Sequence, residues 1–115
     1  MVFLIRDFNI EQVLEILRGL KKGNIGEDTI RSSRHVLDNW FSRGTDQNLV
    51  YSSLIDKTPV GISKTGLNTF KLVYDESNRK SEDLYVIIAI EENGKIKILT
   101  IYGFSKERRE KHYEL

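Results

Sequence analysis

The chain is 115 residues long, with 39% hydrophobic and 30% charged residues, and its 18 Lys and Arg nearly balance 17 Asp and Glu. This size and composition are typical of one globular domain and exclude a disordered chain. The near-neutral charge excludes a general electrostatic attraction to nucleic acid, and the lack of cysteine excludes disulfide bonds and thiolate metal sites.

The chain begins with a short apolar run, Met1–Ile5, which Arg6 and Asp7 interrupt. A run of this length is too short for a signal-peptide core or a membrane span. Together with the lack of cysteine, it predicts a cytoplasmic protein that does not associate with membranes.

The first predicted helix occupies residues 9–23. Asn9 is a favourable N-cap, and Gln12, three residues later, completes a capping-box pattern. Apolar residues then recur at helical spacing, and the stripe consists of Val13, Ile16, Leu17 and Leu20. The helix is expected to end at Gly23 after two lysines, as the helix dipole and the C-cap rules favour.

Two more helices are predicted before the first strand. One runs from about Ser33 to Arg43, and the glycine that follows is placed to end it. The other covers Gln47–Asp56 with Thr45 or Asp46 as its N-cap, and it ends at Thr58-Pro59 because proline disfavours helical geometry in the preceding residue. The apolar stripes are Val36, Leu37, Trp40 and Phe41 in the first of these helices, and Leu49, Val50 and Leu54 in the second.

The second half of the chain has the pattern of strands. Val60–Lys64 and Thr69–Tyr74 flank a glycine-containing turn and predict a hairpin. Leu84–Ile90 is almost continuously apolar, which predicts a central strand covered on both faces. Asn93-Gly94 is the signature of a type I′ two-residue turn and joins this strand to Lys95–Tyr102.

That turn predicts a register in which Glu92 pairs with Lys95. One face would then carry the pairs Tyr85/Tyr102, Ile87/Thr100 and Ala89/Ile98. The other face would carry Val86/Ile101, Ile88/Leu99 and Ile90/Lys97. The second set is the more apolar and is expected to pack on the helices, so the face with Tyr85 and Tyr102 is expected to hold an open site.

Helices followed by strands predict an α+β fold. We expect N-terminal helices packed on one face of a roughly four-stranded antiparallel sheet. No linker, internal repeat or low-complexity tract divides the sequence, so residues 1–115 are expected to form a single domain.

Two segments carry a resemblance to a known family. Ser33-Arg34-His35-Val36, followed by Arg43-Gly44, lies in the second helix, and Leu99-Thr100-Ile101-Tyr102 lies in the last strand. With the order of elements, they resemble the RelE-like superfamily of small ribonuclease toxins, most of all BrnT-type toxins and their short relatives, over residues 29–109. The resemblance implies a RelE-like fold and a metal-independent endoribonuclease that uses no cofactor and is neutralised by an antitoxin protein.

Cleavage of RNA without a metal requires a base for the 2′-hydroxyl, an acid for the leaving 5′-oxygen, and cations to stabilise the phosphate. The residues predicted to be catalytic are His35, Arg43 and Tyr102. Imidazole titrates near neutrality, and guanidinium groups bind phosphate in a bidentate manner. The residues predicted to bind RNA are Lys64, Lys71, Lys106, Arg108 and Arg109. The expected partners are RNA, which could be associated with the ribosome, and an antitoxin.

Each of these residues also has a purely structural explanation. His35 precedes an apolar stripe and could be a structural or surface histidine, and Arg43 complements the C-terminal end of a helix dipole. The lysines and arginines after Ser105 alternate with glutamates, as on a solvated helix, and Tyr85 with Tyr102 could be an ordinary cross-strand pair. The alternative function is therefore a non-catalytic protein-binding module on the same fold, with its partner on the helices or at a sheet edge.

Other functional classes find less support in the sequence. There is no glycine-rich phosphate loop, nucleophile elbow, HExxH motif or EF-hand, and His35 and His112 are too distant in sequence to indicate a metal site. Sequence-specific DNA binding is disfavoured because the helix at Gln47–Asp56 carries no arginine to read base edges.

Overall fold

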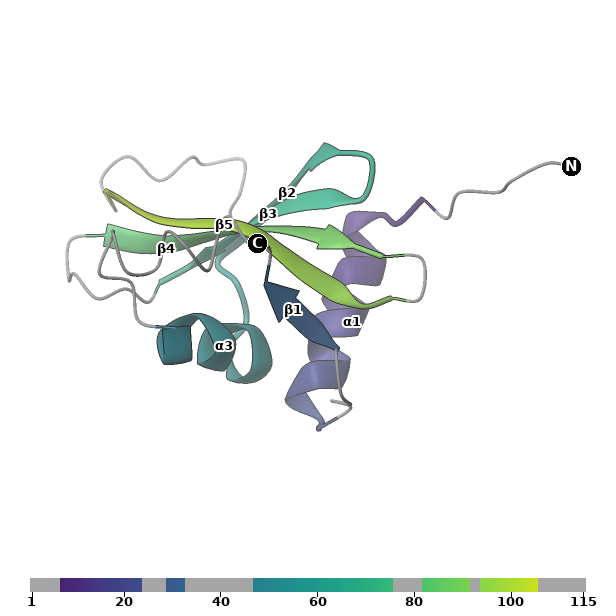
Figure 1. Cartoon of the computed structure of the whole chain (residues 1–115), viewed down its shortest axis with the longest axis horizontal. Coiled ribbons are helices and arrows are strands. Elements are labelled where there is room, and N and C mark those ends of the chain that lie inside the picture. The colour runs from purple at the N-terminus through teal and green to yellow at the C-terminus, as the bar shows by residue number, and fades with distance from the viewer. Residues whose placement is uncertain (1–6, 24–28, 33–46, 76–81, 92–93, 106–115) are drawn as a thin grey trace, which may run out of the picture.

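The computed structural model describes residues 7–23, 29–32, 47–75, 82–91 and 94–105. In chain order, the elements are α1 (Ile10–Lys21), β1 (Ile30–Ser32), α3 (Gln47–Asp56), β2 (Gly61–Gly66), β3 (Thr69–Tyr74), β4 (Glu82–Ile90) and β5 (Ile96–Ser105). The strands form one five-stranded sheet in the order β1-β5-β4-β3-β2, with α1 and α3 on the same side of it (Figure 1). The predicted α+β class and the central position of β4 are confirmed. The helix predicted over Ser33–Arg43 lies outside the described residues.

The sheet has one strand more than the roughly four that were predicted, and it is not wholly antiparallel. The additional strand, β1, pairs in parallel with β5, so that Arg31 lies beside Lys97. Ser32 forms a hydrogen bond of 3.0 Å between its Oγ and Oη of Tyr51 on α3. A strand of three residues is too short to show a period of two, and its partner lies near the other end of the chain, so the local pattern could not reveal it.

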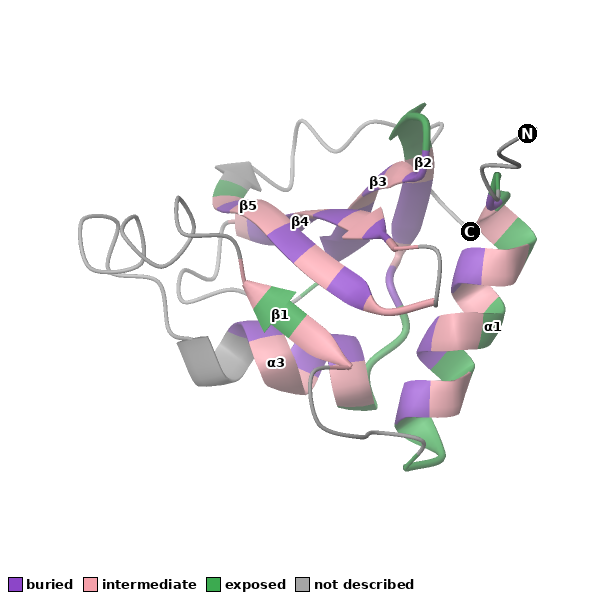
Figure 2. Cartoon of the chain, turned by 45° about the vertical axis from the view of Figure 1, so that its right-hand side comes forward, coloured by how far each residue is buried: buried purple, intermediate pink, exposed green. Residues whose placement is uncertain are grey.

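Helix α1 forms as its sequence predicts. The Asn9 side chain accepts a hydrogen bond from Gln12 N at 2.9 Å, and Asn9 N donates to Gln12 Oε1 at 2.8 Å, which completes the capping box. The helix buries Val13, Leu17 and Leu20 against the sheet, and its exposed residues face away from the sheet (Figure 2). Gly23 follows with a φ of +93°, a left-handed conformation that glycine adopts without strain.

Helix α3 covers the other half of the same side of the sheet. Val50 and Leu54 are fully buried, as the stripe predicts, and so is the polar Ser53 between them. The helix ends at Asp56, shortly before the buried Pro59. None of the helices in the described part of the chain is long and apolar enough to cross a membrane.

The β4–β5 hairpin departs from its predicted register in the half next to the turn. Gly94 has a φ of +80° and donates its N–H to Glu91 O, and Ile90 pairs with Ile96 rather than with Lys97. A bulge opposite Ile87 and Ile88 then restores the predicted register. Beyond the bulge, the predicted pairs Val86/Ile101, Tyr85/Tyr102 and Ile87/Thr100 are all present.

Burial explains why the predicted register is wrong near the turn. The observed pairing places Ile96 and Ile98 in the core, where both are fully buried. The predicted pairing would have placed Lys97 there instead, and an unpaired ammonium group is far too costly to bury. Each buried isoleucine contributes about 1.5–3 kcal/mol to stability, which outweighs the preference of Asn-Gly for a two-residue turn.

The β2–β3 turn ties α1 to the sheet through Asn68. Its side-chain Oδ1 accepts a hydrogen bond from Phe8 N at 2.8 Å, immediately before the N-cap of α1. Its own carbonyl oxygen accepts a hydrogen bond from Ile90 N, also at 2.8 Å. Asn68 has a φ of +59°, which asparagine tolerates better than most residues with a side chain.

We predict that two substitutions at Asn68 separate its hydrogen bond from its backbone conformation. Asn68→Gly keeps the left-handed backbone but leaves the buried Phe8 N–H without its acceptor, at a cost of about 1–3 kcal/mol in the free energy of unfolding. Asn68→Ala should cost a further amount of about 1 kcal/mol because alanine is strained at positive φ. Urea denaturation measures both. The exposed neighbour Leu67→Ala is the control and should change stability little; an Asn68→Gly variant as stable as the wild type would refute the role of the bond.

Tyr74 is a polar side chain in the core beneath the helices. It is 1% exposed, and its hydroxyl has no hydrogen-bond partner in the described part of the chain, nor has the hydroxyl of Ser53. Burial raises the pKa of the Tyr74 hydroxyl far above its ordinary value, because the phenolate would be desolvated. Tyr74 is therefore neutral in the folded protein at a pH where it ionises in the unfolded chain.

We predict that this tyrosine makes the protein sensitive to alkali. Above pH ~10 the unfolded chain loses the Tyr74 proton and the folded protein retains it, so stability falls with pH by up to about 1.4 kcal/mol per unit. Tyr74→Phe should reduce that fall and be neutral or stabilising at pH 7, since it removes a buried hydroxyl. The control Tyr51→Phe loses the bond to Ser32 and should cost about 1 kcal/mol at pH 7. Denaturant titrations from pH 7 to 11 give the comparison; equal slopes for Tyr74→Phe and wild type would contradict it.

Candidate functional site

The sheet has a second face, turned away from α1 and α3, whose residues are given by the strand register. We call it the second face. Three rows of side chains cross it: Arg31, Lys97, Ala89 and Thr69; then Thr100, Ile87, Lys71 and Ser63; then Tyr102, Tyr85, Val73 and Gly61. The rows alternate along each strand with the residues that pack under the helices. Most of these side chains are half-buried, so the face is partly accessible to solvent.

An aromatic and cationic cluster occupies one end of the second face. The rings of Tyr85 and Tyr102 are 5.1 Å apart and tilted by 36°, and the Lys71 ammonium group lies 6.0 Å from the centre of the Tyr85 ring. Tyr85 and Val73 are buried, with Val60 and Tyr102 packed against them. Tyr102 is therefore the half-exposed member of the pair, and Lys71 places its charge beside it.

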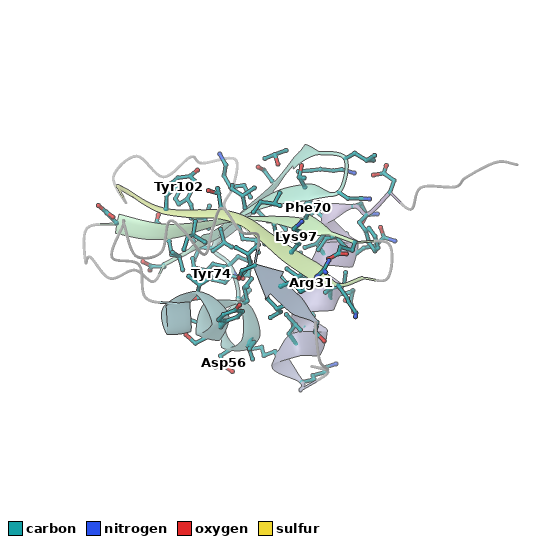
Figure 3. The ribbon with its side chains drawn as sticks, viewed as in Figure 1. Arg31, Asp56, Phe70, Tyr74, Lys97 and Tyr102 are labelled. Atoms are coloured by element: carbon teal, nitrogen blue, oxygen red, sulfur yellow. The ribbon has the colours of Figure 1, made fainter. Side chains whose placement is uncertain are left out.

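The other end of the second face carries two adjacent cations. Arg31 on β1 and Lys97 on β5 are register partners, and Figure 3 shows both near the same edge of the sheet. Arg31 Nη2 donates a hydrogen bond of 2.5 Å to Glu91 Oε1, in a pair whose Arg31 side chain is 49% exposed. This contact holds the guanidinium at the surface while leaving much of it accessible.

The two cationic ends are separated by a distance that suits a chain-like ligand. Lys97 and Lys71 lie two strands apart and one row apart on the same face. Standard spacings of about 4.8 Å between strands and about 6.7 Å along them put the two Cα atoms about 12 Å apart. The two ammonium groups can therefore contact different phosphates of one strand more readily than the same phosphate.

Lys64 lies on the opposite side of the sheet from Lys71 and Tyr102. Its ammonium group donates to Asp7 Oδ1 at 2.5 Å and to Phe8 O at 2.8 Å, and it lies 5.8 Å from the centre of the Phe70 ring. The structure thus does not bring Lys64 together with the other two. The sequence contained the signal, because Lys64 follows Ile62 by two residues and must share its core-facing side.

The other predicted site residues are not placed. His35, Arg43, Lys106, Arg108 and Arg109 lie outside the described residues. Their roles therefore stay predictions.

Sequence reasoning missed Arg31 and Lys97 as members of the second face. Arg31 was missed because β1 was not predicted, and Lys97 because the expected register placed it on the other side. The alternation Ile96-Lys97-Ile98 was the available signal, since two isoleucines flanking one lysine favour a strand with the lysine outward.

The described part of the second face supplies groups for binding rather than a complete set for catalysis. It offers cations from three strands, the half-exposed ring and hydroxyl of Tyr102, and the hydroxyls of Thr100 and Ser63. Such a mixture suits a polyanion that carries aromatic bases. Among the described residues, no group of three His, Cys, Asp or Glu is placed to hold a metal ion. Searches of protein-family models, of curated proteins and of solved structures find no match to this chain.

Proposed function

We propose that this protein is a RelE-like endoribonuclease that binds single-stranded RNA on the second face of its sheet and cleaves it without a metal. The observation that supports this most is the gathering of Arg31, Lys97, Lys71 and Tyr102 on the face that α1 and α3 leave uncovered. A net charge of +1 gives the whole chain little attraction for RNA, so this local arrangement carries the proposal.

Each group on the second face has a distinct task in binding. Lys71 and Lys97 neutralise phosphates along the strand, and Arg31 adds a planar guanidinium at the edge. Tyr102 offers its half-exposed ring to a base and its hydroxyl to a phosphate or a 2′-hydroxyl. Stacking tolerates any base, so the preference should be for unpaired RNA rather than for a particular sequence.

The cleavage step rests on the residues that the family resemblance supplies. A base removes the proton of the 2′-hydroxyl, whose oxygen attacks the adjacent phosphorus, and the bond to the 5′-oxygen breaks as that oxygen receives a proton. His35 is proposed as the acid/base residue, and Arg43, Lys106, Arg108 and Arg109 as cations that stabilise the phosphate. We propose a cytoplasmic location, an RNA substrate that could be ribosome-associated, and an antitoxin as protein partner.

We predict that neutralising the second face weakens RNA binding. Lys71→Gln with Lys97→Gln should weaken binding to a single-stranded RNA oligonucleotide about tenfold at 0.1 M salt. The loss of two phosphate contacts should reduce the slope of log K against log salt by about 1.4. Fluorescence anisotropy measures both quantities. Lys64→Gln and Lys22→Gln, on other surfaces, are matched controls and should bind as the wild type does; a loss confined to Lys64→Gln would show that the second face is not the binding surface.

We predict further that the purified protein cleaves single-stranded RNA in the presence of EDTA. His35→Ala combined with Arg43→Ala should reduce the rate at least a hundredfold, since a positioned acid/base residue contributes about 10²–10⁴-fold. Denaturing gels with end-labelled RNA give the rates, and growth arrest on expression is the cellular counterpart. Intact RNA together with normal growth at high expression of the wild type would contradict the nuclease and favour the non-catalytic binding module.

A further inference from the structure

A second candidate binding site lies on the helix side of the molecule, between α1 and the segment that leads from α3 to β2. It is a pocket of about 280 Å³ lined by Leu14, Leu17, Arg18, Lys21, Lys57, Thr58 and Pro59. All of its residues come from the described part of the chain, and none belongs to the second face of the sheet. The RNA proposal does not use this pocket.

The floor of this pocket is apolar. Leu17 and Pro59 are buried, and Leu14 is half-buried beside them. These three side chains come from two segments that are distant in sequence, so the pocket depends on the packing of α1 against the segment that follows α3. An apolar floor of this kind stabilises a hydrocarbon or aromatic group that is removed from water.

The rim of the pocket is cationic. Arg18, Lys21 and Lys57 are the charged residues of the lining, which holds no carboxylate. Lys21 Nζ donates a hydrogen bond of 3.3 Å to Thr58 Oγ1, which holds the lysine across the mouth and leaves two further N–H donors on its ammonium group. The rim therefore presents donors that suit an anion.

Charge accounting indicates how much negative charge the rim can accept. Glu15, outside the lining, forms an ion pair with Arg18. The C-terminal ends of α1 and α3 each carry about half a negative charge, so together with Glu15 they offset about two of the three positive charges. About one positive charge remains, which a single carboxylate or sulfonate would balance.

The geometry points to a binding site for a small amphiphilic monoanion, with its apolar part on Leu14, Leu17 and Pro59 and its charged head at Lys21 and Lys57. The volume is at the lower end of the range of about 300–1,000 Å³ that ligand pockets span, so the ligand is smaller than a typical drug or nucleotide. A medium-chain carboxylate has the required chemistry. Such a ligand would link α1 to the segment after α3 and stabilise their packing.

The test compares two probes of equal chain length, octanoate and the neutral 1-octanol, on the full-length protein. Chemical-shift changes in ¹H–¹⁵N spectra should saturate with octanoate and centre on Leu14–Lys21 and on Lys57 and Thr58. The affinity for 1-octanol should be at least tenfold weaker. Equal binding of the two probes, or shifts that stay linear or spread over the whole molecule, would overturn the proposal without any variant.

A pair of charge variants locates the head group. Lys21→Glu with Lys57→Glu should weaken octanoate binding at least tenfold, whereas Lys22→Glu, adjacent to Lys21 but outside the lining, should change it less than twofold. Circular dichroism establishes that both proteins are folded. Similar losses in both proteins would show that octanoate responds to overall charge rather than to this pocket. Because the pocket and the second face are separate, RNA binding by Lys21→Glu with Lys57→Glu should be unaffected, which keeps the two proposals distinguishable.

Discussion

The rest of the structure depends on the way β5 pairs with β4. Near the turn the pairing is one residue shorter on β5 than an Asn-Gly hairpin would give, and a bulge beside Leu99 compensates for the difference. This combination places Ile96 and Ile98 under the helices, Ile101 beside them, and Lys97 on the opposite face. Hydrophobic burial is the larger energy, and the turn and the bulge adapt to it.

The helix side shows how a few polar contacts position elements that hydrophobic packing alone would leave free to slide. Asn68 joins the start of α1 to the β2–β3 turn and, through its carbonyl oxygen, to the end of β4. Lys64 holds the same start of α1 through Asp7 and the carbonyl oxygen of Phe8. These contacts set where the C-terminal half of α1 meets the segment after α3, which is where the amphiphilic pocket forms.

The two proposed sites divide the molecule between the two sides of the sheet. The second face draws its cations from three strands, including Arg31 on the parallel edge strand, whereas the pocket takes its cations from the ends of two helices. Both sites are local concentrations of positive charge in a chain whose formal net charge is only +1. Composition alone therefore gave no indication of either site.

The sequence by itself determined the elements whose signals are local. The Asn9–Gln12 capping box, the stripe of α1, the end of α3 before Pro59 and the β2–β3 hairpin all depend on residues close together in the chain, and all were predictable. Only the tertiary structure decided the pairing of β1 with β5, the bulge beside Leu99, and hence which cations share a face. These features depend on contacts between distant segments, and the energy that selects them is the burial of apolar side chains in the assembled core, which no local pattern records.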